Sequence, residues 1–210
     1  MNISKNIQLI LFDLGGVIID IDWKKSVKAF ADLTNSSFDE LNQLMRKEEL
    51  VQRIETGKMD SIEFRDWFCQ VFNKDFDDAE IDNAWNAMLL EIPKERIELI
   101  KTLKENYSVM CLSNTNEIHI NELNSKLSLI SEFDSLEKLM DKTYYSHLLK
   151  TRKPEPKAWE IILNENQLEA ESVLYFDDNE RNHQVATELG FNSVLIDAEY
   201  TIEKYFNGRI

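Results

Sequence analysis

Short hydrophobic runs alternate with longer segments of mixed polarity along this chain. Runs rich in apolar and β-branched residues are typical of strands buried on both faces of a sheet. These runs, and one less apolar extended segment, begin at Ile10, Ser108, Lys142, Val173 and Ser193. The segments expected to form helices between and after them are residues 96–104, 117–126, 158–164 and 180–189. Strands that alternate with helices in this way predict an α/β fold with a doubly wound, three-layer parallel sheet.

Residues 21–92 interrupt this alternation. Their apolar residues recur at helical spacing, and the segment contains no convincing strand. Asp60 or Ser61 is well placed to cap one of these helices. We therefore expect residues 21–92 to form a small all-helical domain of about four bundled helices. It is inserted into a core domain made of residues 1–20 and 93–210.

The charge of the chain restricts its partners. The 210 residues carry a formal net charge of −15, which argues against nucleic acid or an anionic membrane as a partner. The first residues lack a basic start followed by a long apolar stretch, and no run approaches the ~20 apolar residues needed to span a bilayer. We expect a cytoplasmic protein whose oligomeric state is open.

The cysteines and histidines lack the spacing of a metal site. Cys69 and Cys111 stand far apart in apolar surroundings, so we interpret them as buried thiols. His119, His147 and His183 are scattered, with no ligand-like partner nearby in the sequence. Ordinary polar roles are expected for all three histidines.

Polar residues gather where the predicted buried strands end. Because the carboxyl ends of parallel strands meet at one edge of a sheet, these residues are expected to lie together. They are Asp13, Ser113-Asn114 and Asp177-Asp178, joined by Lys153 from a loop held between two prolines. An Asp after the first strand can also do no more than cap a turn, so that motif alone leaves both interpretations open.

The residue types at this edge suit phosphoryl transfer. Asp13 and Asp178 offer the hard oxygen ligands that Mg²⁺ prefers. Ser113 and Asn114 offer hydroxyl, amide and backbone N–H donors to a phosphoryl oxygen, and Lys153 adds a positive charge. An aspartate such as Asp13 can act as the nucleophile and form an aspartyl-phosphate.

The order and context of four motifs resemble the haloacid dehalogenase superfamily of hydrolases across essentially the whole chain. The motifs are Phe12-Asp13-Leu14-Gly15-Gly16-Val17, Leu112-Ser113-Asn114, Arg152-Lys153-Pro154-Glu155-Pro156 and Tyr175-Phe176-Asp177-Asp178-Asn179. The resemblance implies a Rossmann-like core, and it makes residues 21–92 similar to the family's four-helix cap of the first type (C1), which lies over the active site and selects substrate. Within the family the chain most resembles bacterial sugar-phosphate phosphatases similar to α-D-glucose-1-phosphate phosphatase.

The resemblance implies a role for each site residue. Asp13 would be the nucleophile and a Mg²⁺ ligand, with the Gly15 carbonyl and Asp178 as further ligands. Asp177 would lie behind the ligands and orient a metal-bound water or Lys153. The last roles concern the transferring phosphoryl group: Ser113 and Asn114 would hold it, and Lys153 would neutralise its charge and that of Asp13.

One position departs from the family pattern. Most phosphatases of this family carry an Asp two residues after the nucleophile as general acid and base, and this chain has Gly15 there. General acid–base catalysis contributes typically ~10²–10⁴-fold, so the absence of this group should show in the activity. Three outcomes are open. Asp20, Asp22 or a residue of the cap takes the role, a good leaving group needs less help, or the protein is slow or inactive.

Three functions remain in competition at this point. The first is a Mg²⁺-dependent phosphatase for a small phosphorylated metabolite, such as a sugar phosphate. The second is a metal-independent 2-haloacid dehalogenase, against which the Asp177-Asp178 pair argues, because clustered carboxylates without a cation repel an anionic transition state. The third is a non-catalytic binding module that retains the fold. Cap residues that we expect to set specificity are Trp23, Arg46, Glu48 and Lys58.

Overall fold

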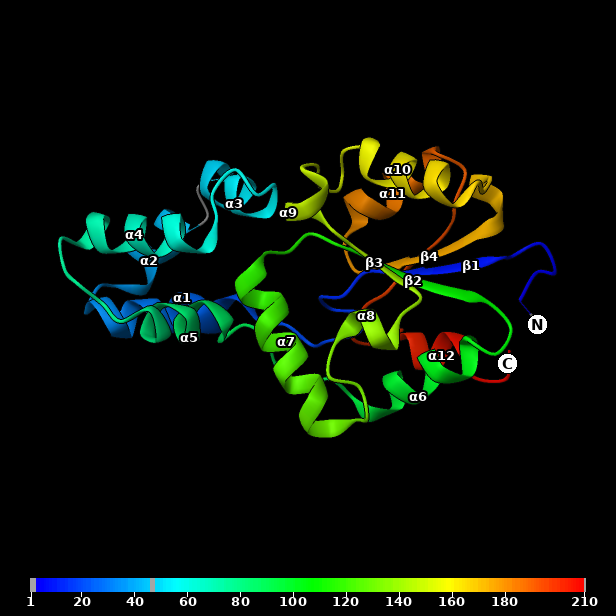
Figure 1. Cartoon of the computed structure of the whole chain (residues 1–210), viewed down its shortest axis with the longest axis horizontal. Helices are drawn as coiled ribbons and strands as arrows, with labels where there is room; N and C mark the ends of the chain where they lie inside the picture. Colours follow the sequence, from blue (N-terminus) through cyan, green and yellow to red (C-terminus); the bar gives the residue numbers. More distant parts are fainter. Residues whose placement is uncertain (1–2, 46–47, 210) are drawn as a thin grey trace.

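A parallel sheet forms the centre of the molecule (Figure 1). The structure is a computed structural model that describes residues 3–45 and 48–209, with Glu48 described by its backbone only. The strands lie in the order β3-β2-β1-β4-β5, and all neighbours are parallel. They are β1 (Leu9–Phe12), β2 (Ser108–Ser113), β3 (Lys142–Tyr145), β4 (Val173–Asp177) and β5 (Asn192–Leu195). The predicted doubly wound α/β fold is confirmed, and β1 is its central strand.

Helices cover both faces of this sheet. Figure 1 shows α10 (Lys157–Asn166) and α11 (Glu180–Glu188) on one face. The helices of the other face are α6 (Lys94–Leu103), α7 (Glu117–Ile130), α8 (Leu136–Leu139) and α12 (Ile202–Phe206). Two single-turn elements, α9 (Ser146–Leu149) and a 3-10 turn (Ala170–Ser172), were not predicted, and neither was α8. One turn is too short to produce a helical periodicity in a sequence.

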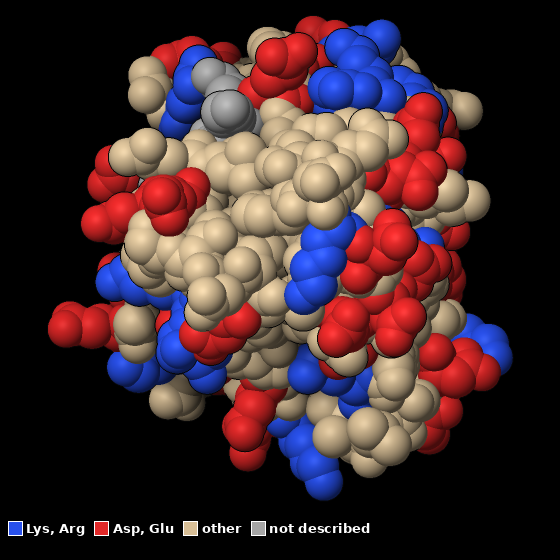
Figure 2. Space-filling model, turned by 90° about the vertical axis from the view of Figure 1, so that its left-hand side faces the viewer, with Lys and Arg blue, Asp and Glu red and all other residues tan. Residues whose placement is uncertain are grey.

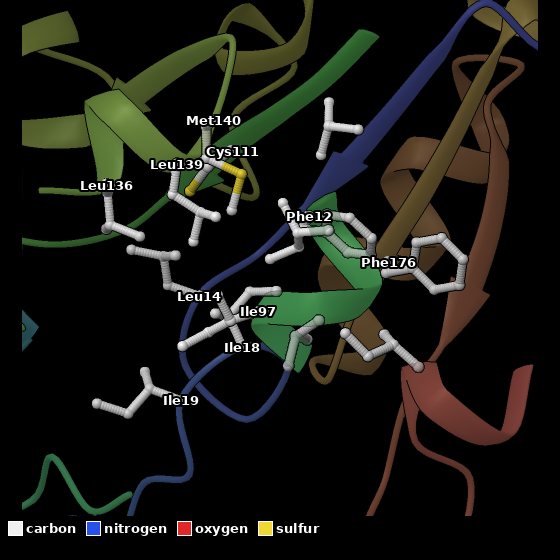
Figure 3. Close-up of a cluster of buried hydrophobic side chains, with 14 of the residues drawn as sticks. Phe12, Leu14, Ile18, Ile19, Ile97, Cys111, Leu136, Leu139, Met140 and Phe176 are labelled. Carbon is white, nitrogen blue, oxygen red and sulfur yellow. The ribbon is translucent and has the colours of Figure 1, made fainter. Parts of the chain in front are cut away.

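Alternate residues of β1, β2, β3 and β4 enter two hydrophobic clusters, one on each face of the sheet. Leu9 and Leu11 belong to the cluster under α10 and α11. Phe12 belongs to the opposite cluster, where its ring stacks on Phe176 with 5.1 Å between centroids and Ile97 of α6 packs nearby (Figure 3). Burial on both faces explains why β1 is apolar along its whole length and why β2 is apolar between its two terminal serines.

A separate group of helices lies between β1 and α6 in the sequence. These helices are α1 (Trp23–Thr34), α2 (Phe38–Met45), α3 (Glu48–Glu55), α4 (Ser61–Phe72) and α5 (Asp78–Asn86). They enclose a further hydrophobic cluster, in which Phe30 and Phe68 lie 4.8 Å apart and to which Ile118 of α7 also contributes. About four helices were predicted and the described residues contain five, because the sequence analysis did not separate α3 as a helix of its own. The helix caps were predicted correctly at α4, where Asp60 forms a capping box with Glu63.

Two extended segments connect these helices to the sheet. The backbone of Asp20 accepts a hydrogen bond from Leu90 N (2.9 Å) and donates one to Glu91 O (3.0 Å). Ile21 and Leu89 form an antiparallel bridge beside them. We propose the boundaries 20/21 and 92/93 between a core and a helical cap, supported by the separate hydrophobic cluster and by this paired connection.

Seen from the cap end, the surface carries charges of both signs. Figure 2 shows a broad area of uncharged residues bordered by acidic and basic side chains. No helix among residues 3–45 and 48–209 is long and apolar enough to cross a membrane.

The burial of one cysteine differs from the prediction, whereas two histidines have the polar contacts that were expected. Cys111 is buried as predicted, but Cys69 is only half-buried, with its Sγ near the carbonyl of Phe76. His119 Nδ1 lies 2.9 Å from Asn86 Oδ1, and His183 Nδ1 lies 2.8 Å from Ser193 Oγ. These contacts confirm ordinary polar roles for two of the histidines.

Candidate active site

The predicted site residues come together at the carboxyl edge of the sheet. Asp13 follows β1, and its backbone N–H donates to the Phe176 carbonyl of β4 (2.9 Å). Ser113 ends β2 and Asp177 ends β4, the two strands that flank β1. Asp13, Ser113 and Asp177 are buried, and Asp178 is exposed beside them. The topology therefore brings together groups that are up to about 160 residues apart in the chain.

Lys153 bridges two of these carboxylates. Its Nζ lies 3.0 Å from Asp13 Oδ2 and 2.7 Å from Asp177 Oδ2, and the residue is only 1% exposed. Burial lowers the pKa of Lys153, but the adjacent carboxylates of Asp13 and Asp177 raise it above its ordinary value overall. The buried ammonium group therefore stays charged at neutral pH.

The side chain of Asn114 fixes the backbone of Lys153. Its Nδ2 donates to the Lys153 carbonyl (2.8 Å), and its Oδ1 accepts from the Lys153 N–H (2.9 Å). Both ends of the amide are therefore engaged by the loop. Asn114 thus holds the backbone of Lys153 in place. The sequence analysis had assigned Asn114 to phosphate binding and did not predict this contact.

Asp177 is held by a network of donors. Its carboxylate accepts hydrogen bonds from the Asn179 N–H (2.8 Å), from Asn182 Nδ2 (3.1 and 3.2 Å) and from the Tyr175 hydroxyl. Burial raises the pKa of Asp177, but Lys153 and these donors outweigh it and hold the pKa below its ordinary value. Asp177 is therefore an ionised group that positions Lys153.

A group of three carboxylates faces this single ammonium. Oxygens of Asp13, Asp177 and Asp178 all lie within 4.8 Å of one another. Burial raises the pKa of Asp13 to about 7, with Asp177 and Asp178 adding to the effect against the opposing charge of Lys153. Burial and Asp177 likewise raise the pKa of Asp178. The excess negative charge and the oxygen donors fit a hard divalent cation.

Two glycines shape the loop next to Asp13. Gly16 has a φ of 72°, and a Cβ there would overlap with the carboxylate of Asp178. A Cβ on Gly15 would lie 3.1 Å from Ile21 Cδ1, so a side chain at position 15 meets the segment that leads into the cap. The loop thus lets Asp178 approach closely, and at position 15 a side chain would press on the exposed Ile21.

The two acids proposed to replace that group have other partners. Asp20 Oδ1 lies 2.9 Å from Arg96 Nη1. Asp22 caps α1 by accepting from the Lys24 N–H (3.0 Å). Asp20 also borders a cavity of about 530 Å³ that reaches Asp178. Among the described residues neither acid forms a hydrogen bond or ion pair with Asp13, and of the two only Asp20 shares a cavity with Asp178.

The proposed specificity residues are only partly described. Trp23 packs edge-on against Trp85 of α5, with 5.8 Å between centroids, and Lys58 is exposed. Arg46 and the side chain of Glu48 lie outside the described residues.

Some residues at the site were missed from the sequence. Tyr175 and Asn182 reach Asp177, and Glu55 of the cap lies against Arg152. Asn182 stands on the buried side of α11, one turn after the Asn179 that caps this helix. Asn182 could have been found as a polar residue in the first turn of the helix that follows Asp177. No local sequence pattern marks Glu55.

The sheet, the carboxylate group and the buried lysine together define a hydrolase of the α/β type. Residues 7–190 match the family described as haloacid dehalogenase-like hydrolase. The chain therefore belongs to the haloacid dehalogenase-like hydrolases, and it is an enzyme by family.

Similar proteins of known activity or structure come from the same family. The chain is 30% identical over 187 residues to the D-ribitol-5-phosphate phosphatase of Bacteroides thetaiotaomicron, covering 89% of this chain and 90% of that protein. The HAD family enzyme BT-2542 of the same organism superposes with a TM-score of 0.89 at 31% identity, covering 96% and 99% of the two chains. Its complex with magnesium and inorganic phosphate gives a TM-score of 0.87 at 30% identity, covering 95% and 99%. The L-2-haloacid dehalogenase of Xanthobacter autotrophicus shares the fold alone, with a TM-score of 0.61 and 16% identity over 96% and 83% of the chains.

Proposed function

We propose that this protein is a Mg²⁺-dependent phosphatase that hydrolyses a small phosphorylated metabolite, a sugar or sugar-alcohol phosphate, through an aspartyl-phosphate intermediate. The observation that carries the proposal is the buried Lys153 between Asp13 and Asp177, with Asp178 within reach of both carboxylates. This arrangement combines a nucleophile with fixed positive charge, as phosphoryl transfer requires.

Asp13 is the nucleophile in this proposal. Its carboxylate oxygen attacks phosphorus, and Lys153 Nζ, 3.0 Å from Asp13 Oδ2, stabilises the negative charge of the phosphoryl group as it is transferred. The buried Ser113 hydroxyl and the backbone N–H groups that follow β2 hold the phosphoryl oxygens. Asn114 contributes by fixing the Lys153 loop, because both ends of its amide are engaged there.

The carboxylates of Asp13 and Asp178 and the carbonyl of Gly15 would hold the Mg²⁺. When bound, the ion supplies positive charge that keeps Asp13 ionised and neutralises phosphoryl oxygens. Asp177 stays behind these ligands and fixes Lys153. The magnesium and phosphate complex of BT-2542 supports this assignment.

The substrate class rests on the relatives and on the cap. The D-ribitol-5-phosphate phosphatase covers nearly the whole chain, including the helical segment 21–92. A small polyol or sugar phosphate is the substrate class that this relative's name supports. The dehalogenase hypothesis is weaker, because its structural support is limited to the fold.

Phosphate release from a panel of sugar and sugar-alcohol phosphates, measured with Mg²⁺ and with EDTA, tests the proposal. Release that depends on Mg²⁺ is expected for at least one ester. Release that is unchanged in EDTA would contradict the metal assignment. Turnover of 2-haloacids without phosphate release would favour the dehalogenase, and no turnover of either class would favour a binding module.

A further inference from the structure

The loop that follows β2 is held from the end of β3 by one buried hydroxyl. The Ser146 hydroxyl donates to the Thr115 carbonyl (3.3 Å), and its oxygen accepts a hydrogen bond from the Thr115 N–H (2.9 Å). Ser146 is 1% exposed and Thr115 is 5% exposed. Because Thr115 lies two residues after Ser113, this contact fixes the backbone of the loop that is assigned to phosphate binding.

Strand pairing explains why Ser146 reaches this loop. Ser113 is paired with Tyr145 at the carboxyl ends of the parallel strands β2 and β3. Ser146 follows Tyr145 and begins α9, so it leaves the sheet beside the residues that follow Ser113. Tyr145 is itself buried, and its hydroxyl donates to the Glu137 carboxylate (2.7 Å). The end of β3 is therefore a fixed support for the hydroxyl of Ser146.

A second contact connects the same loop to Lys153. The Asn114 amide binds the Lys153 backbone through both its nitrogen and its oxygen, and Lys153 Nζ lies 3.0 Å from Asp13 Oδ2. Asn114 and Thr115 are adjacent, so the two contacts restrain consecutive residues of the loop. The ends of β2 and β3 and the loop of Lys153 are thus joined in one network that reaches the candidate nucleophile.

The contact with Ser146 also restricts which donors of the loop are available. The Thr115 N–H donates to Ser146, so it is not free to bind a phosphoryl oxygen. The Ser113 hydroxyl and the Asn114 N–H remain as the donors of this loop. Such donors stabilise a transition state when they already point at the place where charge develops. A misplacement of about 1 Å can lower a rate about 10²-fold, so a residue that fixes this loop can affect the reaction without contacting the substrate.

We propose that Ser146 is a positioning residue for phosphoryl transfer, acting through Thr115 on the Ser113 hydroxyl and the Asn114 N–H; this rests on the proposed phosphatase function. Ser146 holds the loop in the conformation in which both donors face the transferring phosphoryl group. Without its hydroxyl, the buried N–H and carbonyl of Thr115 lose their partner, and the loop moves to pair them elsewhere. The two donors then lose their alignment.

The variant Ser146→Ala tests this role with the best sugar or sugar-alcohol phosphate of the panel. We expect kcat to fall by about 10–100-fold. KM should change much less, because donors that point at developing charge act mainly in the transition state. In the Ser113→Ala background, Ser146→Ala should lower kcat less than it does in the wild type, because one of the donors that Ser146 positions is already missing.

Ser26→Ala is the matched control. Ser26 is also 1% exposed, and its hydroxyl likewise joins two backbone groups, donating to the Trp85 carbonyl (2.6 Å) and accepting from the Met88 N–H (3.0 Å). These contacts join residues of the helical segment 21–92, and none of the three is a candidate site residue. We expect both variants to lower the urea midpoint of unfolding, and only Ser146→Ala to lower kcat in buffer without urea.

A wild-type kcat in Ser146→Ala, an effect confined to KM, or an equal loss of kcat in Ser26→Ala would overturn the role of Ser146 while leaving the phosphatase function intact. A loss of the same size in the Ser113→Ala background would also overturn it. If Ser146→Ala does not fold, Ser146→Cys replaces it, because a thiol is a weaker donor and acceptor at the same place. A smaller loss of kcat is then expected, and an unchanged kcat would overturn the role. A wild-type enzyme that hydrolyses no ester of the panel with Mg²⁺ present would overturn the phosphatase function itself, and Ser146 as its positioning residue with it.

Discussion

Removing the charge of Lys153 should destabilise the fold as well as stop catalysis. Lys153→Met retains an unbranched side chain of similar length but leaves Asp13 and Asp177 without the ammonium that lies 3.0 and 2.7 Å from their oxygens. Breaking a buried ion pair by removing one partner typically costs about 3–5 kcal/mol. We expect a loss of this size, because Lys153 and Asp177 are 1% and 0% exposed.

Urea unfolding followed by tryptophan fluorescence measures this loss. Because the urea slope for small proteins is about 1–3 kcal/mol/M and increases with size, the midpoint should fall by about 1–2 M in EDTA. The pKa of Asp177 is held below its ordinary value, so the stability it contributes is present above its unfolded pKa and is lost as pH falls. The difference in urea midpoint between the wild type and Lys153→Met should therefore become smaller at acidic pH.

The double variant Lys153→Met/Asp177→Asn checks the cause. It removes the stranded charge while Tyr175, Asn179 and Asn182 still surround the amide, so it should recover part of the lost stability. A midpoint for Lys153→Met close to that of the wild type would refute the idea that this ammonium compensates the buried carboxylates. A double variant less stable than the single one would also contradict it.

Three further predictions concern Asp13 and the metal site. Asp13→Asn should abolish phosphate release with its circular dichroism spectrum unchanged, and near-normal release would exclude Asp13 as the nucleophile. Asp178→Ala should raise the Mg²⁺ concentration needed for half-maximal activity; an unchanged titration would assign the ligand to Asp177. Gly16→Ala should also raise the Mg²⁺ concentration needed for half-maximal activity, because the new Cβ would displace the Asp178 carboxylate. It should lower the melting temperature as well, because the φ of 72° at this position disfavours a side chain. Wild-type behaviour in both assays would contradict the close packing of Gly16 on Asp178.

The sequence was sufficient to predict the positions of the candidate site residues along the sheet edge. Asp13 and Asp177 each follow an apolar run, and such runs identify buried parallel strands whose carboxyl ends share one edge. The positions of Ser113 and Lys153 followed from the same rule and from the family motifs. The prediction succeeded here because each group is placed by its own local segment.

Contacts made between distant segments were not predictable in the same way. The amide of Asn114 binds the Lys153 backbone 39 residues later, and Glu55 meets Arg152 across the cap and core. Helix α3, which carries Glu55, was not predicted as a separate helix. Such pairings depend on how the cap packs on the core, which no local pattern records.

The aspartyl-phosphate is the most direct test of the proposed function. The enzyme is mixed with its best sugar or sugar-alcohol phosphate, quenched with acid during turnover, digested and analysed by peptide mass spectrometry. We predict that one phosphoryl group is found on Asp13 when Mg²⁺ is present, and none in EDTA or in Asp13→Asn. A phosphoryl group on another residue, or Mg²⁺-dependent turnover in Asp13→Asn, would contradict Asp13 as the nucleophile.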